Sequence, residues 1–189
     1  LVVNLRELDC TTIVETVGAL NRVRKTGRTT FSDFCKALEQ LRYWNGKMDG
    51  YCSRLHYFTW WMQDNLSKNE IIEVYDSVYT ITPLVVNNYY MSLYPDKYKF
   101  LKNKPARVAQ IKALEKKYNK KDGNYIATRH LNLGRSELGF IKDGDIIAIV
   151  TAKKGLDYSH LGFAVWGKDG KLHMLHASSL KKKVIEDAT

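Results

Sequence analysis

One cysteine and two histidines are the residues of this chain whose types could do chemistry together. Cys10 stands near the start of the sequence, and His160 and His176 stand near its end. A cysteine thiolate attacks carbonyl carbon, one imidazole takes the thiol proton, and a further polar group orients that imidazole and fixes its tautomer. We therefore interpret Cys10 as a nucleophile, His160 as its base and His176 as the orienting third residue.

Cys10 lies where an apolar start turns into a helical pattern. Asp9 is a good N-cap residue, and Ile13, Val17 and Leu20, with Val14 beside them, recur at the spacing of one buried helix face. Cys10 then falls in the first turn, where unpaired N–H groups and the helix dipole favour the thiolate. By itself this position is weak evidence, because buried structural cysteines are common.

The histidines lie on two stretches that read as a hairpin. Residues 159–166 form a predicted strand, 167–170 a turn and 171–177 a second strand. Strand side chains alternate, so His160 should share a face with the small residues Gly162 and Ala164. We expect the helix that carries Cys10 to pack on that face.

The loop length decides whether the two histidines meet. An odd number of loop residues, such as 167–169, puts His160 and His176 on one face and directly opposite each other, whereas two or four would put them on opposite faces. His173 points the other way from His176, so these two should not hold a metal together.

Composition limits the class of protein. The chain has 189 residues, is 44% hydrophobic and carries a formal net charge of +10. It has neither a linker-like stretch nor an apolar run of membrane-spanning length, so we expect a single domain over 1–189 without a transmembrane segment. Three cysteines without a CxxC pair argue against a disulfide framework and a closed zinc site. The sequence starts without Met and stops at Thr189, so we expect both ends to be cut.

The remaining pattern supplies further elements. We predict helices over 31–41 and 105–119 and strands over 71–75, 78–81 and 146–150, and we expect Phe31 and Phe34 on the buried face of the second helix. The aromatic-rich segment 57–66 could be a sugar or peptide platform, but composition favours a place in the core.

Four motifs in order carry a family resemblance. They are Asp9-Cys10-Thr11-Thr12, Asp143-Gly144-Asp145-Ile146-Ile147, Ser159-His160-Leu161-Gly162-Phe163 and His176-Ala177-Ser178. Together they resemble the NlpC-type papain-like cysteine amidases and peptidases of bacterial cell-wall metabolism. The resemblance implies an α+β papain-like fold, with the nucleophile helix packed on an antiparallel sheet and a helical, aromatic insert between helix and sheet.

A branch of that superfamily is closer still. Residues 1–10, 51–57, 155–160 and 176–179 resemble the N-acetylmuramoyl-L-alanine amidase-like branch, formerly a domain of unknown function. This implies hydrolysis of the lactyl–L-Ala amide of muropeptides, with a preference for anhydromuramoyl-peptides, and no cofactor or metal. It also implies a place in the bacterial cell envelope, with the periplasm expected and the cytoplasm as the alternative. The insert supplies the substrate-side candidates Tyr51, Ser53, Arg54, His56 and Tyr57.

Two alternatives remain open. The same chemistry could cut the stem peptide between D-glutamate and a diamino acid, as an endopeptidase. The chain could instead be a non-enzymatic basic module that binds envelope or nucleic acid, since lysines cluster at 116–117, 120–121 and 181–183. The ordered Cys, His, His set favours the enzyme, and we expect no nucleic-acid partner.

Overall fold

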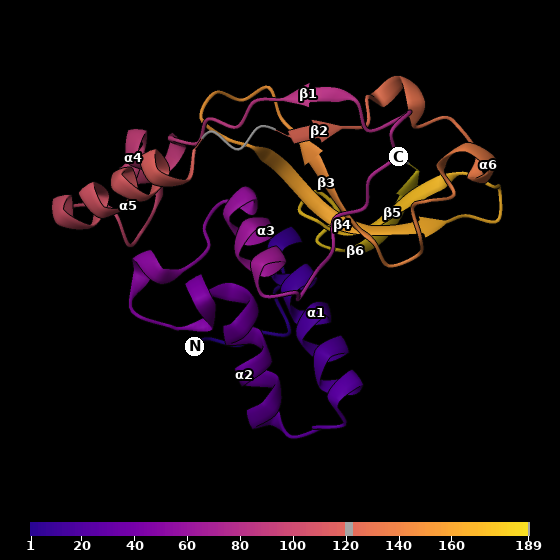
Figure 1. The fold of residues 1–189 in the computed structure, drawn as a ribbon. Helices are drawn as coiled ribbons and strands as arrows, with labels where there is room; N and C mark the ends of the chain where they lie inside the picture. The colour runs from indigo at the N-terminus through magenta and orange to yellow at the C-terminus, as the bar shows by residue number, and fades with distance from the viewer. Residues whose placement is uncertain (120–122, 189) are drawn as a thin grey trace.

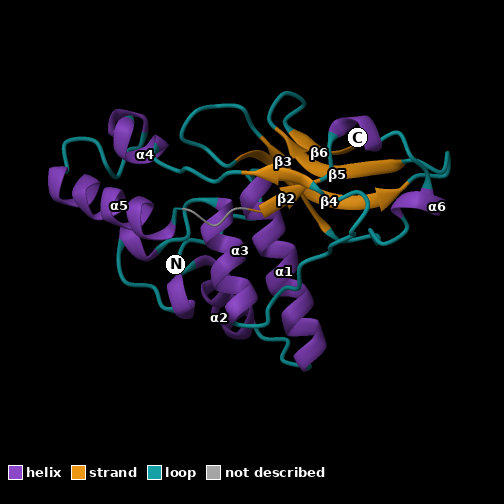
Figure 2. Ribbon diagram, turned by 45° about the horizontal axis from the view of Figure 1, so that its top comes forward, coloured by secondary structure: helices purple, strands orange, loops and turns teal. Residues whose placement is uncertain are grey.

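The computed structural model describes residues 1–119 and 123–188, so Lys120 and Lys121 of one lysine cluster lie outside the described residues. The architecture is mixed α+β. Three helices, α1, α2 and α3, lie together on one side of a four-stranded antiparallel sheet (Figures 1 and 2). Two more, α4 and α5, form a separate arm beside them, and α6 lies at the opposite end of the sheet (Figure 1).

The elements have the following bounds. The α-helices are α1 (Cys10–Thr26), α2 (Phe31–Arg42), α3 (Phe58–Ser67), α4 (Tyr90–Leu93), α5 (Pro105–Tyr118) and α6 (Arg135–Leu138). Short 3₁₀ turns are η1 (Trp44–Gly46), η2 (Tyr51–Ser53), η3 (Pro95–Lys97) and η4 (Thr128–His130). The strands are β1 (Thr82–Leu84), β2 (Gly123–Tyr125), β3 (Ile146–Val150), β4 (Tyr158–Trp166), β5 (Leu172–Ser178) and β6 (Lys183–Ala188).

The main sheet is a meander in the order β3-β4-β5-β6, and β1 pairs separately with β2. Between β3 and β4 the ladder shifts, because Ile149 pairs with His160 and Val150 with Tyr158. Ser159 is therefore an extra residue on β4, a β-bulge. Bulges re-aim side chains and are frequent beside active sites.

The first helix is buried on a different face from the predicted one. Ile13 and Val14 are buried as expected, but Val17 is 42% exposed and Leu20 is 53% exposed. Glu15, Thr16 and Ala19 are buried in their place. The apolar spacing predicted the wrong buried face because a charged residue, Glu15, lies on the buried side of the helix.

Glu15 can be buried because two arginines neutralise it. Its side chain is fully enclosed, and Arg42 Nε donates to Glu15 Oε2 at 2.7 Å. Arg54 Nη2 donates to the same oxygen at 2.9 Å. Arg42 also donates to the carbonyl of Val2 at 3.0 Å, so the cluster fixes the segment that leads into α1. A buried carboxylate without such partners would be strongly destabilising.

The face of the sheet that receives α1 also differs from expectation. Leu161 and Ala177 belong to the same buried cluster as Ile13 and Val14, whereas Ala164 belongs to a second cluster with Leu138, Ile141 and Leu172. The helix therefore packs on the face opposite to that of His160, Gly162 and Ala164. Those residues are small for other reasons: Ala164 lies under α6 and the segment that follows it, and Gly162 makes room for His176.

The aromatic segment is core, as composition favoured. Tyr57, Trp60 and Trp61 are each at most 3% exposed and join the cluster beneath the sheet. Phe34 is buried on α2 as predicted, but Phe31 is 67% exposed at the first helical position.

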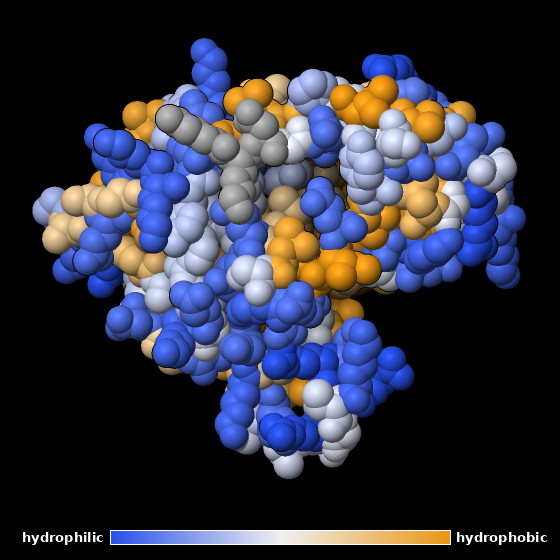
Figure 3. Space-filling view, in the orientation of Figure 1, coloured by the Kyte–Doolittle hydropathy of each residue, from blue (hydrophilic) through white to orange (hydrophobic). Residues whose placement is uncertain are grey.

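The strand predictions for 71–75 and 78–81 are wrong. This segment is irregular, and Asp76 Oδ1 accepts hydrogen bonds from the N–H groups of Val78 and Tyr79, which closes a turn. Ile72, Val78 and Ile81 are exposed, and hydrophobic residues gather on the surface between α3 and the sheet (Figure 3). β-branched residues favour a strand only where a partner strand is available.

Within the described residues, none of the helices combines the length and the hydropathy that crossing a membrane requires.

The Glu15 cluster gives a stability prediction. Arg42→Met leaves the buried carboxylate with a single partner, and we expect the free energy of unfolding to fall by about 3 kcal/mol in urea titrations. The matched control is Arg24→Met on the exposed end of α1, which should change it by less than about 0.5 kcal/mol. Equal effects of the two variants would show that the cluster does not hold α1.

Candidate functional site

Cys10 and His160 line one pocket of about 150 Å³ at the junction of α1, α3, α4 and the start of β4. The bulge at Ser159 lets successive residues of β4 reach it. The lining residues are Cys10, Thr11, His56, Tyr57, Phe58, Met91, Tyr98, Leu156, Asp157, Tyr158, Ser159, His160 and Leu161.

The start of α1 has features that can stabilise a thiolate. Asp9 Oδ1 accepts from Thr12 N at 2.7 Å, and Thr12 Oγ1 accepts from Asp9 N at 2.8 Å, so a reciprocal capping box fixes the first turn. No described residue accepts a hydrogen bond from the backbone N–H of Cys10 or Thr11. These two N–H groups lie in the first turn of the helix, where they can stabilise negative charge.

The two histidines meet on one face of the hairpin. Trp166 pairs with Leu172, so residues 167–171 form the loop, an odd number as the prediction required. Continuing this register sets Gly162 opposite His176, which makes His160 and His176 diagonal neighbours rather than directly opposed residues. Their rings nevertheless contact, with His160 Nε2 at 2.7 Å from His176 Nδ1. A Cβ on Gly162 would lie 2.9 Å from Cβ of His176, so only glycine fits there.

An aspartate continues this chain of hydrogen bonds, and sequence reasoning missed it. His176 Nε2 lies 3.2 Å from Asp187 Oδ2 on β6. A carboxylate only accepts, so His176 carries its proton on Nε2 and accepts from His160 at Nδ1. His160 then keeps Nδ1 free as the basic nitrogen. Residues 183–188 lack the strict alternation of apolar and polar residues that would have signalled this partner, although β6 pairs with β5 along that whole segment.

Burial and the neighbouring His176 set the protonation state of His160. Desolvation first, and then the electrostatic effect of His176, lower the pKa of His160 below its usual value. At neutral pH the free imidazole is therefore unprotonated and able to accept a proton. In the described structure Sγ of Cys10 makes no hydrogen bond to His160, but both residues line the same pocket.

Only some of the residues that were predicted to contact the substrate line the pocket. His56 and Tyr57 do so, whereas Tyr51, Ser53 and Arg54 do not. His56 Nε2 donates to the carbonyl of Tyr51 at 2.9 Å, and burial lowers the pKa of His56 to about 4, so its ring is neutral.

The other three candidates support the walls of the pocket. Arg54 is engaged with Glu15, and Ser53 closes a turn by donating to the carbonyl of Gly50. Tyr51 packs its ring on His56 at 4.4 Å between centroids. Their assignment as substrate-contacting residues came from the segment as a whole, and the packing direction of each side chain could not be predicted.

Tyr57 is tied into the wall by its hydroxyl. It donates to Glu115 Oε1 at 2.7 Å and accepts from Met91 N at 2.9 Å. Burial raises the pKa of Tyr57 far above its usual value, so the phenol stays neutral. Tyr57 therefore offers its ring rather than its hydroxyl to the pocket.

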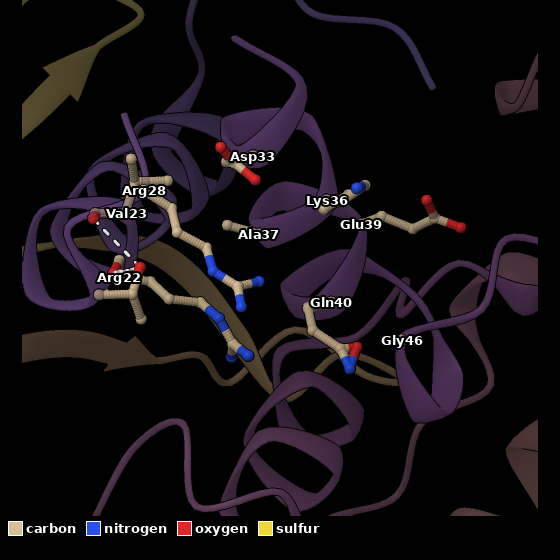
Figure 4. Close-up of a pocket in the computed structure, with 10 residues that line it drawn as sticks. Arg22, Val23, Arg28, Asp33, Lys36, Ala37, Glu39, Gln40 and Gly46 are labelled. Carbon is tan, nitrogen blue, oxygen red and sulfur yellow. Dashed lines mark hydrogen bonds between the residues drawn. The ribbon is translucent and has the colours of Figure 1, made fainter. Parts of the chain in front are cut away.

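A larger cavity of about 300 Å³ lies between α1 and α2. Arg22 and Arg28 point into it beside Asp33, Lys36 and Gln40 (Figure 4). It is lined by neither a cysteine nor a histidine, and Arg22 already pairs with Glu70. The smaller pocket is thus the one that combines a nucleophile with a base.

Comparison with known proteins identifies similar proteins by sequence and by fold. The profile of the AmiA-like family, described as N-acetylmuramoyl-L-alanine amidase-like, matches residues 1–189. An N-acetylmuramoyl-L-alanine amidase from Bacteroides uniformis is similar at 38% identity with a TM-score of 0.87, over 99% of this chain and 77% of that one. No curated protein sequence matches significantly.

Two other solved structures are similar. A Bacteroides fragilis protein described provisionally as a xylanase has 38% identity and a TM-score of 0.86, over 100% of this chain and 81% of that one. A Legionella pneumophila protein has 24% identity and a TM-score of 0.66, over 95% of this chain and 68% of that one, and supports the fold alone.

The hydrogen-bond chain predicts a positioning role for Asp187. Asp187→Asn should lower kcat by about tenfold, because the carboxylate stabilises the imidazolium through His176. It should also move the acidic limb of the kcat/KM profile to lower pH, because an imidazolium that is less stabilised lowers the pKa of His160, and the base stays unprotonated in more acidic solution. The measurement is kcat/KM against pH on a peptidoglycan-type substrate.

Glu186→Gln is the matched control. It removes the neighbouring acid–histidine contact on the same two strands, His173 Nδ1 to Glu186 Oε1 at 2.8 Å, which lies outside the pocket. An unchanged pH profile in Asp187→Asn, or the same change in both variants, would exclude the positioning role.

Proposed function

The chain belongs to the N-acetylmuramoyl-L-alanine amidase-like family, and on this premise we propose that it is a cysteine-dependent amidase with a papain-like, NlpC-type site. The reaction is hydrolysis of the amide between the lactyl group of N-acetylmuramic acid and L-Ala, preferably in anhydromuramoyl-peptides. We assign it to cell-wall turnover and recycling in the bacterial envelope.

One observation carries the proposal. A thiol in the first turn of a capped helix and an imidazole held by a second imidazole and a carboxylate open into the same pocket. Nucleophilic acyl transfer needs a thiol as nucleophile and an imidazole as base. A lone Cys–His pair has no third group that orients the base, and this site has one.

The first half of the reaction forms a thioester. His160 Nδ1 takes the Cys10 proton, and the thiolate sulfur attacks the lactyl carbonyl carbon. The oxyanion that forms lies at the helix start, where the N–H groups of Cys10 and Thr11 can donate to it. The tetrahedral intermediate collapses by breaking the C–N bond, and the L-Ala nitrogen leaves as an amine with the proton from His160.

The second half restores the enzyme. Water gives a proton to His160 and attacks the thioester carbon. The second tetrahedral intermediate then expels the thiolate, which takes the proton back from His160. The products are a sugar with a free lactyl carboxylate and a peptide with a free L-Ala amine. His176 and Asp187 keep the His160 ring in one orientation during both proton transfers.

The pocket walls suit this substrate. Tyr57, Phe58 and Tyr158 present aromatic rings, which pack well on sugar and peptide surfaces. His56 offers a neutral imidazole, and its Nδ1 is left without a hydrogen bond to any described residue.

Glycoside hydrolysis fits the pocket poorly, although one similar protein is described as a xylanase. That chemistry normally needs two carboxyl groups on either side of the scissile bond. The pocket is lined by one carboxylate, Asp157, which is buried and already accepts from Thr59 N, Thr59 Oγ1, Asn88 Nδ2 and its neighbour Tyr158 N.

The proposal predicts which products appear and which cysteine is needed. The wild type incubated with anhydromuramoyl-tripeptide should release free anhydromuramic acid and a tripeptide that starts with L-Ala, as read by mass spectrometry. Cys10→Ala should lose this turnover with little change in stability, whereas Cys35→Ala on α2 should keep it.

Retained turnover in Cys10→Ala would exclude the cysteine mechanism. A product in which the sugar keeps L-Ala and D-Glu would assign the endopeptidase reaction instead. Steeply salt-dependent binding without turnover, unaffected by loss of Cys10, would favour the non-enzymatic module.

A further inference from the structure

Two lysines from distant parts of the chain converge on one buried tyrosine next to the pocket. Lys97 Nζ, on η3, donates to the Tyr90 hydroxyl at 2.7 Å. Lys153 Nζ, on the loop between β3 and β4, lies 4.4 Å from the centroid of the same ring. Both ammonium groups lower the pKa of the Tyr90 phenol, chiefly by hydrogen bonding to it.

A glycine makes this meeting possible. The carbonyl of Gly155 accepts from the N–H groups of Tyr89 and Tyr90 at 3.1 and 3.0 Å, which fastens the β3–β4 loop to the start of α4. Gly155 has φ of 82°, and a Cβ there would lie 3.0 Å from the Tyr89 ring. Figure 1 shows this loop reaching away from the sheet toward the arm formed by α4 and α5.

The cluster has an excess of positive charge. No carboxylate of residues 1–119 or 123–188 forms an ion pair with Lys97 or Lys153. Two ammonium groups beside one neutral phenol repel each other, and this repulsion is relieved when an anion joins them. Lysine is suited to such a role because its three donors can turn toward an incoming oxygen.

The cluster borders the catalytic pocket. Met91 and Tyr98, which follow Tyr90 and Lys97 directly in the chain, line the pocket, and so does Leu156 of the loop that carries Lys153. Lys97 and Lys153 are themselves exposed, so an anion can reach them from the pocket mouth.

The chemistry of the substrate decides which anion fits. In a muropeptide the lactyl carboxyl is consumed in the scissile amide, so the sugar side carries no carboxylate. The peptide side does carry free carboxylates, the first of them on D-Glu. We propose that Lys97 and Lys153, with the Tyr90 hydroxyl between them, bind a carboxylate of the stem peptide, so that this wall receives the leaving peptide and the sugar lies on the other side of Cys10.

This inference rests on the proposed function for its substrate. The test compares anhydromuramoyl-tripeptide with two analogues, one amidated at the D-Glu α-carboxyl and one amidated at the diamino acid. The proteins are the wild type, the double variant Lys97→Met/Lys153→Met and a matched control, Lys154→Met, which removes an exposed charge from the same loop.

We expect the double variant to raise KM for the unmodified substrate by about tenfold with kcat changed less than about twofold, as the loss of a charged hydrogen bond implies. For the analogue that lacks the bound carboxylate, wild type and double variant should have equal KM. Lys154→Met should match the wild type on all three substrates. An unchanged KM in the double variant, or an equal loss on every substrate, would overturn the inference.

Equilibrium binding separates this inference from the proposed reaction. In the Cys10→Ala background, calorimetry with the same three compounds should show the same lysine-dependent and carboxylate-dependent difference in Kd. Binding with this difference but without turnover by the wild type would remove the proposed reaction and keep the subsite. Binding without any such difference, or no binding at all, would overturn the subsite.

Discussion

The hydrogen bond between His160 and His176 is the interaction on which the candidate site depends. It joins two strands whose side chains face the same way only because the hairpin loop has an odd number of residues. It also needs Gly162, since any side chain there would collide with His176. Asp187 extends the bond to the last strand, so β4, β5 and β6 must be paired before His160 has a defined tautomer.

The cysteine side of the site is held just as firmly, by a different kind of interaction. A capping box fixes the first turn of α1, and further along the helix Glu15 is locked between Arg42 and Arg54. The buried ion cluster places a helix whose apolar face is narrow, because Val17 and Leu20 remain exposed. Such clusters contribute less to net stability than apolar packing, but loss of one partner is costly. Glu15 therefore fixes the position of the helix that carries Cys10.

The third wall of the pocket comes from the loop before β4. Gly155 fastens this loop to α4, and the buried Asp157 carboxylate binds Thr59 of α3 and Asn88. These contacts bring the aromatic insert against the strand that carries His160. The thiol and the imidazole of the candidate site therefore lie where three independently anchored segments meet. Each anchor depends on a buried polar residue or on a glycine in a strained conformation.

Residue order and spacing predicted much of this arrangement. The cap at Asp9, the hairpin, the shared face of the histidines and the aromatic core all follow from local patterns. The failures have physical causes that lie outside those patterns. Apolar periodicity could not reveal that Glu15 is buried, because its arginine partners are far away in the sequence.

The same holds for the other misses. Strand propensity at Ile72 and Val78 could not show that no strand of the described residues pairs with them. The exposed Asp187 has no local feature that marks it as a partner of His176. Arg54 was a substrate-side candidate because of the segment in which it lies, and the sequence could not show that its guanidinium binds Glu15. A pattern along the sequence does not show which side chains will connect segments that lie far apart in it.

The covalent intermediate tests the central claim most directly. The wild type would be mixed with anhydromuramoyl-tripeptide, quenched in acid within the first turnovers, digested and examined by mass spectrometry. We expect the peptide that contains Cys10 to carry the mass of one anhydromuramoyl acyl group as a thioester that is lost on treatment with hydroxylamine. An acyl group on another residue, or turnover that proceeds in wild type with Cys10 blocked by prior alkylation, would contradict this account.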